Sequence, residues 1–209
     1  MASIQKEIEK KIESCKKGSV IFPSDFALLG SDDAVRQGLS RLVKDGKLIR
    51  LAQGIYLYPE IDKELGIIYP PIENIAEAIA RRDKARIIPT GIQALNRLGL
   101  SAQIPLKAKY MTDGTPRIIK IGNRIIDFQR TNPKILAIKS ELLVLIITAL
   151  KEVGKENITP EIAIQIKKII HKDTKKDIFN ELNKAPSWII KFIKTLSEND
   201  LHNGMVNNR

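Results

Sequence analysis

The chain has few of the residues that build metal centres and disulfide frameworks. Its 209 residues include one cysteine and two histidines. A lone Cys15 excludes an internal disulfide and a cysteine-rich zinc or iron-sulfur site, and His171 and His202 are too few to supply the ligands instead. We therefore expect no metal and no other cofactor. Cys15 continues the apolar stripe of a predicted helix and is expected to be a buried thiol.

Long hydrophobic runs are missing as well. The longest, Leu142–Leu150, is interrupted by Thr148 and has about half of the roughly 20 residues that a membrane-spanning helix needs. The chain is charged from Lys6 onward, unlike a secretory signal. The sequence thus predicts a cytoplasmic protein that has no membrane partner.

The motifs of common enzyme classes are absent too. The sequence contains no glycine-rich phosphate-binding loop, no Gly-x-Ser-x-Gly nucleophile turn and no His-Glu-x-x-His metal site. Asp113 followed by Gly114 is typical of a turn between strands, and Asp62 and Glu64 beside Gly66 predict a loop. We therefore predict that the protein is not an enzyme.

Basic residues outnumber acidic ones, 35 to 24, which gives a net charge of +11 and an isoelectric point near 9.7. Such a surplus favours a polyanionic partner such as nucleic acid. Within the first sixty residues it is concentrated between Arg36 and Gln53, where Asp45 is the only acidic residue. The basic residues of this segment are Arg36, Arg41, Lys44, Lys47 and Arg50.

The N-terminal part of the chain predicts three helices in succession. Isoleucines at four-residue spacing predict a helix over 3–16, and an apolar run over 19–22 predicts a strand. A second, short helix over 26–29 is expected to end at Gly30 in a left-handed conformation. Ser31 is the expected N-cap of a third helix.

The third helix, which we expect to end between Lys44 and Gly46, has two distinct faces. Helical periodicity places four apolar residues on one side, Val35, Leu39, Leu42 and Val43. The opposite side is polar or basic and consists of Arg36, Gln37, Ser40, Arg41 and Lys44. After this helix, β-prone runs over 47–51 and 55–58 flank a tight turn with Gly54, which predicts a hairpin.

Three helices followed by a hairpin predict a winged helix-turn-helix over 1–60. An α-helix fits the major groove of DNA, about 12 Å wide, and a hairpin beside it can contact the backbone. Because arginine and glutamine form paired hydrogen bonds with guanine and adenine, we place Arg36, Gln37 and Arg41 nearest the bases, with Ser40 beside them. The expected phosphate contacts are Lys44, Lys47, Arg50 and Gln53. A winged helix that docks onto a protein is the alternative.

Several stretches within 1–131 resemble AbiEi-type antitoxins of bacterial abortive-infection, type IV toxin-antitoxin systems. In the first domain these stretches are FPSDF at 22–26, AVRQGLSRL at 34–42 and GKLIRLAQGIY at 46–56. PTGIQALNRLGL at 89–100 and YMTDG at 110–114 are similar to the central segment of the same group. The resemblance implies an antitoxin that represses its own operon through the N-terminal domain and counteracts a nucleotidyltransferase-like toxin through the remainder.

Residues 70–131 predict a small α+β domain. Three strands are expected, over 107–112, 117–121 and 124–130. Basic residues alternate with isoleucines there, so one sheet face is expected to be buried and the other cationic. The cationic face is either a second nucleic-acid surface or a polar surface that keeps the protein soluble. Four further basic residues precede the sheet, Arg81, Arg82, Lys84 and Arg86.

Residues 138–200 predict a helical C-terminal region, and 201–209 a loose polar tail. Trp188 is either a core residue or part of a surface for a partner. The fold class is therefore α+β, with a winged helix-turn-helix, a small α+β domain and a helical region in sequence.

The function expected from the sequence is that of a DNA-binding antitoxin. Its partners would be double-stranded DNA at its own promoter and a nucleotidyltransferase-like toxin. The alternative is a stand-alone winged-helix transcriptional regulator whose C-terminal domain senses a ligand or a partner. Both a monomer and a dimer fit the sequence, because paired half-sites suit a dimer or two monomers.

Overall fold

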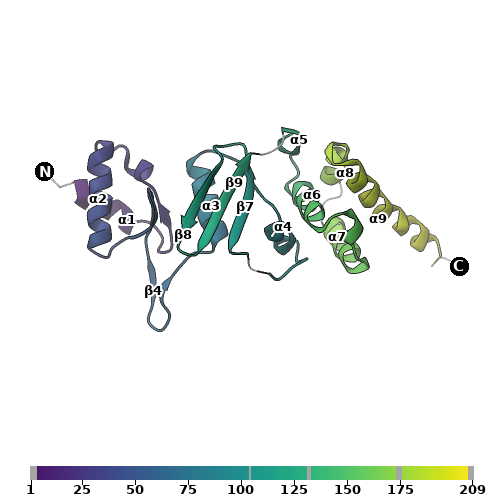
Figure 1. The fold of residues 1–209 in the computed structure, drawn as a ribbon, viewed down its shortest axis with the longest axis horizontal. Coiled ribbons are helices and arrows are strands. Elements are labelled where there is room, and N and C mark those ends of the chain that lie inside the picture. The colour runs from purple at the N-terminus through teal and green to yellow at the C-terminus, as the bar shows by residue number, and fades with distance from the viewer. Residues whose placement is uncertain (1–3, 104, 131–132, 173–175, 207–209) are drawn as a thin grey trace. The chain divides into compact units, whose positions relative to one another are not determined.

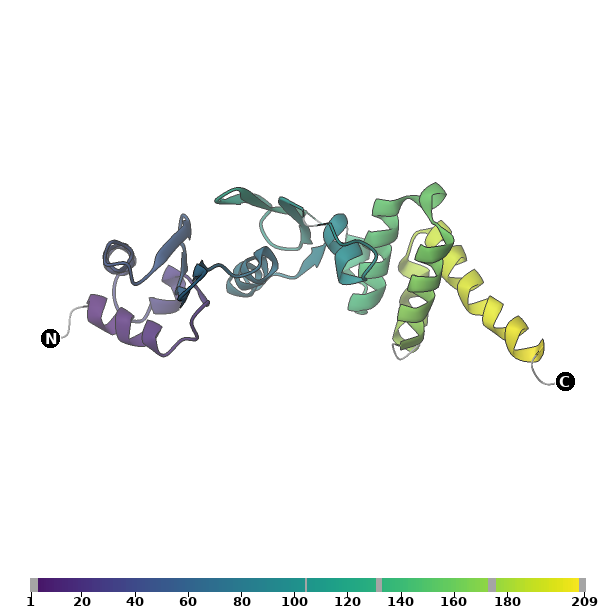
Figure 2. The same ribbon diagram turned by 90° about the horizontal axis from the view of Figure 1, so that it is seen from below.

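The structure is a computed structural model that describes residues 4–103, 105–130, 133–172 and 176–206, without the side chains of 176–177 and 198–206. Figures 1 and 2 show its helices and strands in two views. Contacts divide the chain into two compact units, Met1–Arg86 with Ile118–Ile126, and Ile87–Arg117 with Asp127–Arg209. Helices and sheets occur together, which confirms the α+β class. The domain bounds expected from the sequence stay a prediction.

The first unit begins with helices and a three-stranded antiparallel sheet. The elements are α1 (Ile4–Glu13), β1 (Val20–Ile21), the 3-10 helix η1 (Pro23–Phe26), α2 (Asp32–Lys44), β2 (Ile49–Ala52) and β3 (Ile55–Leu57). The strand order is β1-β3-β2. Apolar side chains of all these elements except β2 form one core, in which Ile8 and Leu39 are fully buried.

The ends of α2 agree with the sequence. The Ser31 hydroxyl accepts a hydrogen bond from the backbone N–H of Ala34 at 3.4 Å, as an N-cap does. Asp32 and Asp33 occupy the first turn, where the helix dipole favours acidic side chains. Gly46 follows the helix with a φ of +73°, a conformation that glycine adopts without strain.

Three local expectations in this part are wrong. The second helix is η1, which ends at Phe26, and Leu28 beyond it is 99% exposed. Gly30 has no left-handed backbone; a Cβ there would lie 2.8 Å from Cδ1 of Ile4, so close packing explains the glycine instead. Cys15 lies beyond the end of α1 and is half-buried, with its thiol donating to the carbonyl of Lys11 at 3.4 Å.

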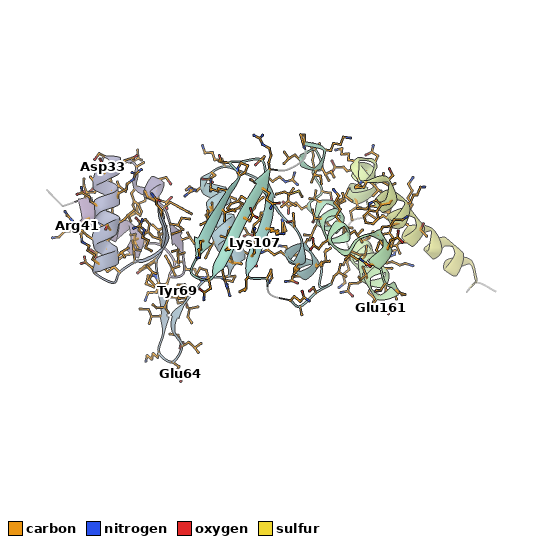
Figure 3. All side chains as sticks on the ribbon, in the orientation of Figure 1. Asp33, Arg41, Glu64, Tyr69, Lys107 and Glu161 are labelled. Atoms are coloured by element: carbon orange, nitrogen blue, oxygen red, sulfur yellow. The ribbon has the colours of Figure 1, made fainter. Side chains whose placement is uncertain are left out.

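A second hairpin replaces the loop expected around Asp62 and Glu64. Strands β4 (Glu60–Asp62) and β5 (Gly66–Ile68) pair antiparallel, and Asp62 Oδ1 accepts the backbone N–H groups of Glu64 and Leu65 at 2.8 and 2.9 Å. These bonds close the turn. The hairpin projects from the helices of its unit, with Glu64 at its tip (Figures 1 and 3). Its apolar Ile61 and Leu65 are 67% and 78% exposed.

Helix α3 (Ile72–Arg82) and a four-stranded sheet follow along the chain. The elements after α3 are β6 (Ile87–Pro89), α4 (Ile92–Arg97), β7 (Lys107–Thr112), β8 (Arg117–Ile121) and β9 (Arg124–Arg130), and the strand order is β6-β7-β9-β8. The bounds of β7, β8 and β9 are those predicted. Residues 75, 76, 79 and 80 of α3 are buried, as helical periodicity predicts.

The second unit ends in a helical region. Its elements are α5 (Pro133–Leu136), α6 (Glu141–Val153), η2 (Lys155–Asn157), α7 (Pro160–Lys172), α8 (Lys176–Glu181), η3 (Leu182–Lys184) and α9 (Ser187–Val206). Helix α6 is buried at Ile146 and Leu150, and Trp188 is half-buried against the same core. Helix α9 extends into the segment expected to be a loose tail, of which 207–209 lie outside the described residues. Within the described chain, no helix combines the length and apolar character needed to cross a membrane.

Candidate nucleic-acid interface

Helix α2 is fixed to α1 by its apolar face. Val35, Leu39 and Leu42 are each at most 1% exposed and belong to the core that contains Ile8. Gly38 lies on this side too, and a Cβ there would lie 2.9 Å from Cδ1 of Ile8, so the missing side chain lets the helices approach closely. Packing on one side therefore determines which side chains of α2 face away from the core.

The five polar residues predicted on the opposite face of α2 are all exposed: Arg36, Gln37, Ser40, Arg41 and Lys44. Figure 3 labels Arg41 on this helix. Arg36 has a weak ion pair with Asp32, 4.0 Å between Nη2 and Oδ2, one helical turn earlier. In the part of the chain that the structure describes, Arg41 and Lys44 form no side-chain hydrogen bond or ion pair. Their charges are therefore available to a ligand.

The hairpin after α2 has the predicted turn and one irregularity. Ala52 pairs with Ile55, so Gln53 and Gly54 form a two-residue turn in which Gly54 has a φ of +68°. The register shifts between Arg50 and Ala52, as in a β-bulge, which bends a strand and redirects its side chains. Arg50 and Gln53 are both exposed. This hairpin is called the wing below.

A hollow between α2 and the wing contains four of the eight predicted side chains. Arg36 and Ser40 come from α2, and Arg50 and Gln53 from the wing. Ser24 of η1 and Arg82 at the end of α3 also line it, and among the described residues no carboxylate does. We call this concavity the arginine hollow. The structure thus joins residues from elements that are far apart in the sequence.

Arg82 is the member that sequence reasoning did not place here. Its guanidinium carbon lies 4.6 Å from the centre of the Phe22 ring, and its Nε donates to Oδ1 of Asp83 at 2.7 Å. The sequence shows Arg82 only as one of several basic residues near the end of a helix. Its contact with a phenylalanine sixty positions earlier leaves no periodic signal.

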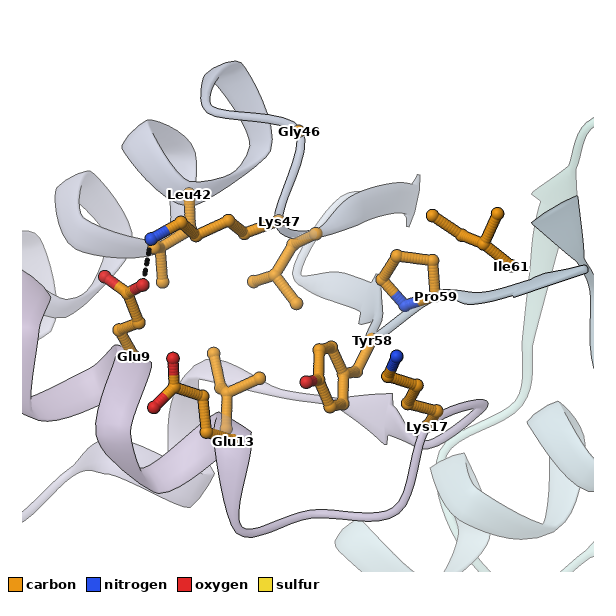
Figure 4. Close-up of a pocket in the computed structure, with 11 residues that line it drawn as sticks. Glu9, Glu13, Lys17, Leu42, Gly46, Lys47, Tyr58, Pro59 and Ile61 are labelled. Atoms are coloured by element: carbon orange, nitrogen blue, oxygen red, sulfur yellow. Dashed lines mark hydrogen bonds and ion pairs between the residues drawn. The ribbon is translucent and has the colours of Figure 1, made fainter. Parts of the chain in front are cut away.

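Lys47 does not line the arginine hollow. Its ammonium group forms an ion pair with Glu9 of α1 and lines a second hollow, together with Glu13 and Lys17 (Figure 4). The hydrogen bond to Glu9 raises the pKa of Lys47 above its ordinary value of 10.5. A phosphate contact at Lys47 would have to compete with the Glu9 carboxylate. Lys47 is therefore not counted among the residues of the candidate site.

One basic residue of the predicted strands is paired with a carboxylate. Lys107 Nζ lies 2.8 Å from Oδ2 of Asp127, which also accepts a hydrogen bond from Gln129 at 3.0 Å. The hydrogen bond from Lys107 lowers the pKa of the Asp127 carboxyl. The expectation that the isoleucines form a buried face is wrong for Ile118, which is 65% exposed because the described elements leave it uncovered. The arginine hollow and α2 are therefore the stronger candidate site.

Comparisons with known proteins give a family but no activity. A model of a family of unknown function, DUF6088, matches residues 7–178, so the chain belongs to that family. No curated protein matches the chain. Among solved structures, the chain is similar to the RV2827C protein from Mycobacterium tuberculosis, with 13% identity, a TM-score of 0.48, and coverage of 94% of this chain and 76% of that one.

Proposed function

We propose that this member of the DUF6088 family binds double-stranded DNA, with α2 in the major groove and the wing along the backbone. The observation that supports this most is the exposed face of α2, from which Arg41 and Lys44 project without a protein partner among the described residues. An α-helix fits a groove about 12 Å wide, and free arginine and lysine side chains bind DNA without first breaking an ion pair.

The composition of this surface favours nucleic acid over a protein partner. Between residues 32 and 57, no large hydrophobic side chain is exposed. Protein interfaces usually have an apolar or aromatic centre, whereas DNA-binding surfaces are polar and strongly basic. The α2 face and the wing therefore have the chemistry that a phosphate backbone and base edges require.

The biological role that we propose is that of an antitoxin. It rests on the resemblance of 22–26, 34–42, 46–56, 89–100 and 110–114 to AbiEi-type antitoxins, which implies repression of the protein's own operon and control of a nucleotidyltransferase-like toxin. A neighbouring gene for such a toxin, whose toxicity disappears when this chain is co-expressed, would support the proposal. Without such a neighbour, a stand-alone regulator is the better interpretation.

The test of DNA binding is a mobility-shift titration with the protein's own upstream DNA and a shuffled duplex of equal composition. We expect the upstream DNA to bind more tightly and log affinity to fall with log salt concentration, because bound phosphates release counterions. A salt slope near zero would show that the protein does not bind DNA through its basic residues.

Arg41→Ala tests the helix face directly. The side chain lies opposite the packed face, so we expect a loss of about 1 to 3 kcal/mol in binding to the upstream DNA and an unchanged circular dichroism spectrum. Lys10→Ala on α1 removes an exposed charge outside the site and is the matched control. Loss of helix in Arg41→Ala would contradict the face assignment, and unchanged affinity would contradict the proposed base contact.

A further inference from the structure

Three arginine residues from three different elements line the arginine hollow. Arg36 comes from α2, Arg50 from β2 and Arg82 from α3. The remaining polar lining consists of hydroxyl and amide groups, including Ser24, Ser40 and Gln53, and no acidic side chain in the described part of the chain lines the hollow. Like charges that share one concavity repel each other, so an anion that enters the hollow is stabilised by all three.

Arg82 is the most firmly held of the three arginines. The Phe22 ring below it is only 4% exposed, and the Arg82 side chain itself is 26% exposed, against 65% for Arg36. Asp83 holds Nε, and the two terminal nitrogens of the guanidinium remain as donors. A side chain held by stacking and by one ion pair loses little conformational freedom when it binds.

The ligand that suits this arrangement is a phosphate group. Its oxygens accept paired hydrogen bonds from planar guanidinium groups, and its charge matches a site with several arginines. We propose that the arginine hollow binds one phosphate of the DNA backbone, with Arg82 as its fixed anchor and Arg36 and Arg50 closing on it from α2 and the wing. This inference rests on the DNA binding proposed above.

The proposal changes the division of roles on α2. Arg36 lines the hollow, so it becomes a phosphate ligand instead of a base contact. Gln37 and Arg41 do not line it and remain the residues for base edges. Loss of Arg82 is therefore expected to weaken all duplexes alike, whereas loss of Arg41 is expected to weaken the preferred sequence most.

The test compares Arg82→Gln with Arg81→Gln, which removes the same charge from a neighbouring exposed residue that does not line the hollow. For Arg82→Gln we expect a salt slope less negative by about 0.9 and affinity about tenfold lower at about 0.1 M salt, equally for the upstream and the shuffled duplex. Arg81→Gln is expected to keep the wild-type slope. Arg82→Lys, which keeps the charge, is expected to keep the slope but lose part of the affinity, because a lysine cannot bind in a paired manner.

A second measurement uses the wild-type protein and does not depend on the folding of any variant. Single phosphates along the bound duplex are replaced one at a time by neutral methylphosphonate. For each protein molecule bound, we expect one phosphate of the duplex at which this replacement weakens binding about tenfold. A folded Arg82→Gln variant is expected to show no further loss at that position, because the anchor is already missing.

The outcomes separate the two proposals. Suppose that the wild-type protein binds DNA, that Arg41→Ala weakens this binding, that Arg82→Gln keeps the wild-type salt slope, and that no methylphosphonate position weakens binding. These results would overturn the phosphate site in the arginine hollow and leave DNA binding in place. A wild-type protein that does not bind duplexes would overturn both. In a third outcome, inorganic phosphate raises the melting temperature of the wild type but not of Arg82→Gln, while the salt slope of DNA binding is the same in both proteins. This result would assign the hollow to a free anion and contradict a contact with the DNA backbone.

Discussion

At the scale of single residues, the value of a charged side chain in this protein depends on its partner. Arg41 and Lys47 carry the same charge and lie six positions apart, yet Arg41 has no ion pair among the described residues and Lys47 is bound to Glu9. Net charge therefore overstates the basic surface that a ligand meets. On α2 and the wing, Arg41, Lys44 and Arg50 are exposed.

Glu181 is a carboxylate with a structural role in the second unit. Its Oε2 accepts the backbone N–H groups of Lys139 and Ser140, each at 2.8 Å, and its Oε1 lies 2.6 Å from the ammonium of Lys184. Lys184 in turn donates to the carbonyl of Ala137 at 2.8 Å. The hydrogen bond from Lys184, followed by that from the Ser140 backbone, lowers the pKa of Glu181 below its ordinary value of 4.5.

We predict that Glu181→Gln lowers the urea midpoint of unfolding at neutral pH. A carboxyl with a lowered pKa in the folded state stabilises the protein above the unfolded pKa, and this stabilisation disappears as the pH falls through the folded value. The difference between wild type and Glu181→Gln should therefore shrink in acid, below pH 4.5. Glu156→Gln, whose side chain is 88% exposed, is the control. If the urea midpoints of wild type and Glu181→Gln differed by the same amount at neutral pH and in acid, the charged interaction would be contradicted.

At the scale of elements, the wing depends on the backbone of one glycine. Gly54 has a φ of +68°, and no atom lies within 4 Å of the position a Cβ would take. A side chain there meets open space, so its cost comes from the left-handed backbone alone. We predict that Gly54→Ala loses about 1 to 2 kcal/mol of unfolding free energy in urea titrations, and that Gly54→Asn loses less because asparagine tolerates this conformation. Equal stability of all three proteins would mean that the turn has another conformation.

Elements with a strong local pattern were predicted well. Short β-prone runs separated by turns at 113–116 and at Gly122 predicted the bounds of β7, β8 and β9, and a capping serine and a glycine predicted those of α2. The hairpin of β4 and β5 was missed because its strands are three residues long and its apolar side chains are exposed, so they lack the pattern of a half-buried strand. Gly30 was misinterpreted because contact with Ile4 leaves no local signature.

At the scale of the whole molecule, two hydrophobic cores share no residue. One contains Ile8 and Leu39 of the first unit, and the other contains Ile146 and Leu150 of the second. We predict that Leu39→Ala and Ile146→Ala each lose about 2 to 5 kcal/mol of local stability, because each removes a fully buried side chain from its own core.

Hydrogen exchange measured on peptides of the intact protein tests this prediction. Leu39→Ala is expected to raise exchange within 4–58 and Ile146→Ala within 133–197, while Ser40→Ala, an exposed neighbour of Leu39, is expected to change neither. Increased exchange in both regions after either core substitution would show that the two cores unfold together.

The amino-acid sequence by itself determined the α+β class, the two faces of α2 and the turn of the wing. These features follow from side-chain periodicity and from glycine or capping residues within a few positions of each other. Only the tertiary structure decided that Arg82 joins Arg36 and Arg50 in one hollow and that Glu9 binds Lys47. Such contacts join elements tens of residues apart, and local periodicity holds no information about which side chains packing brings together.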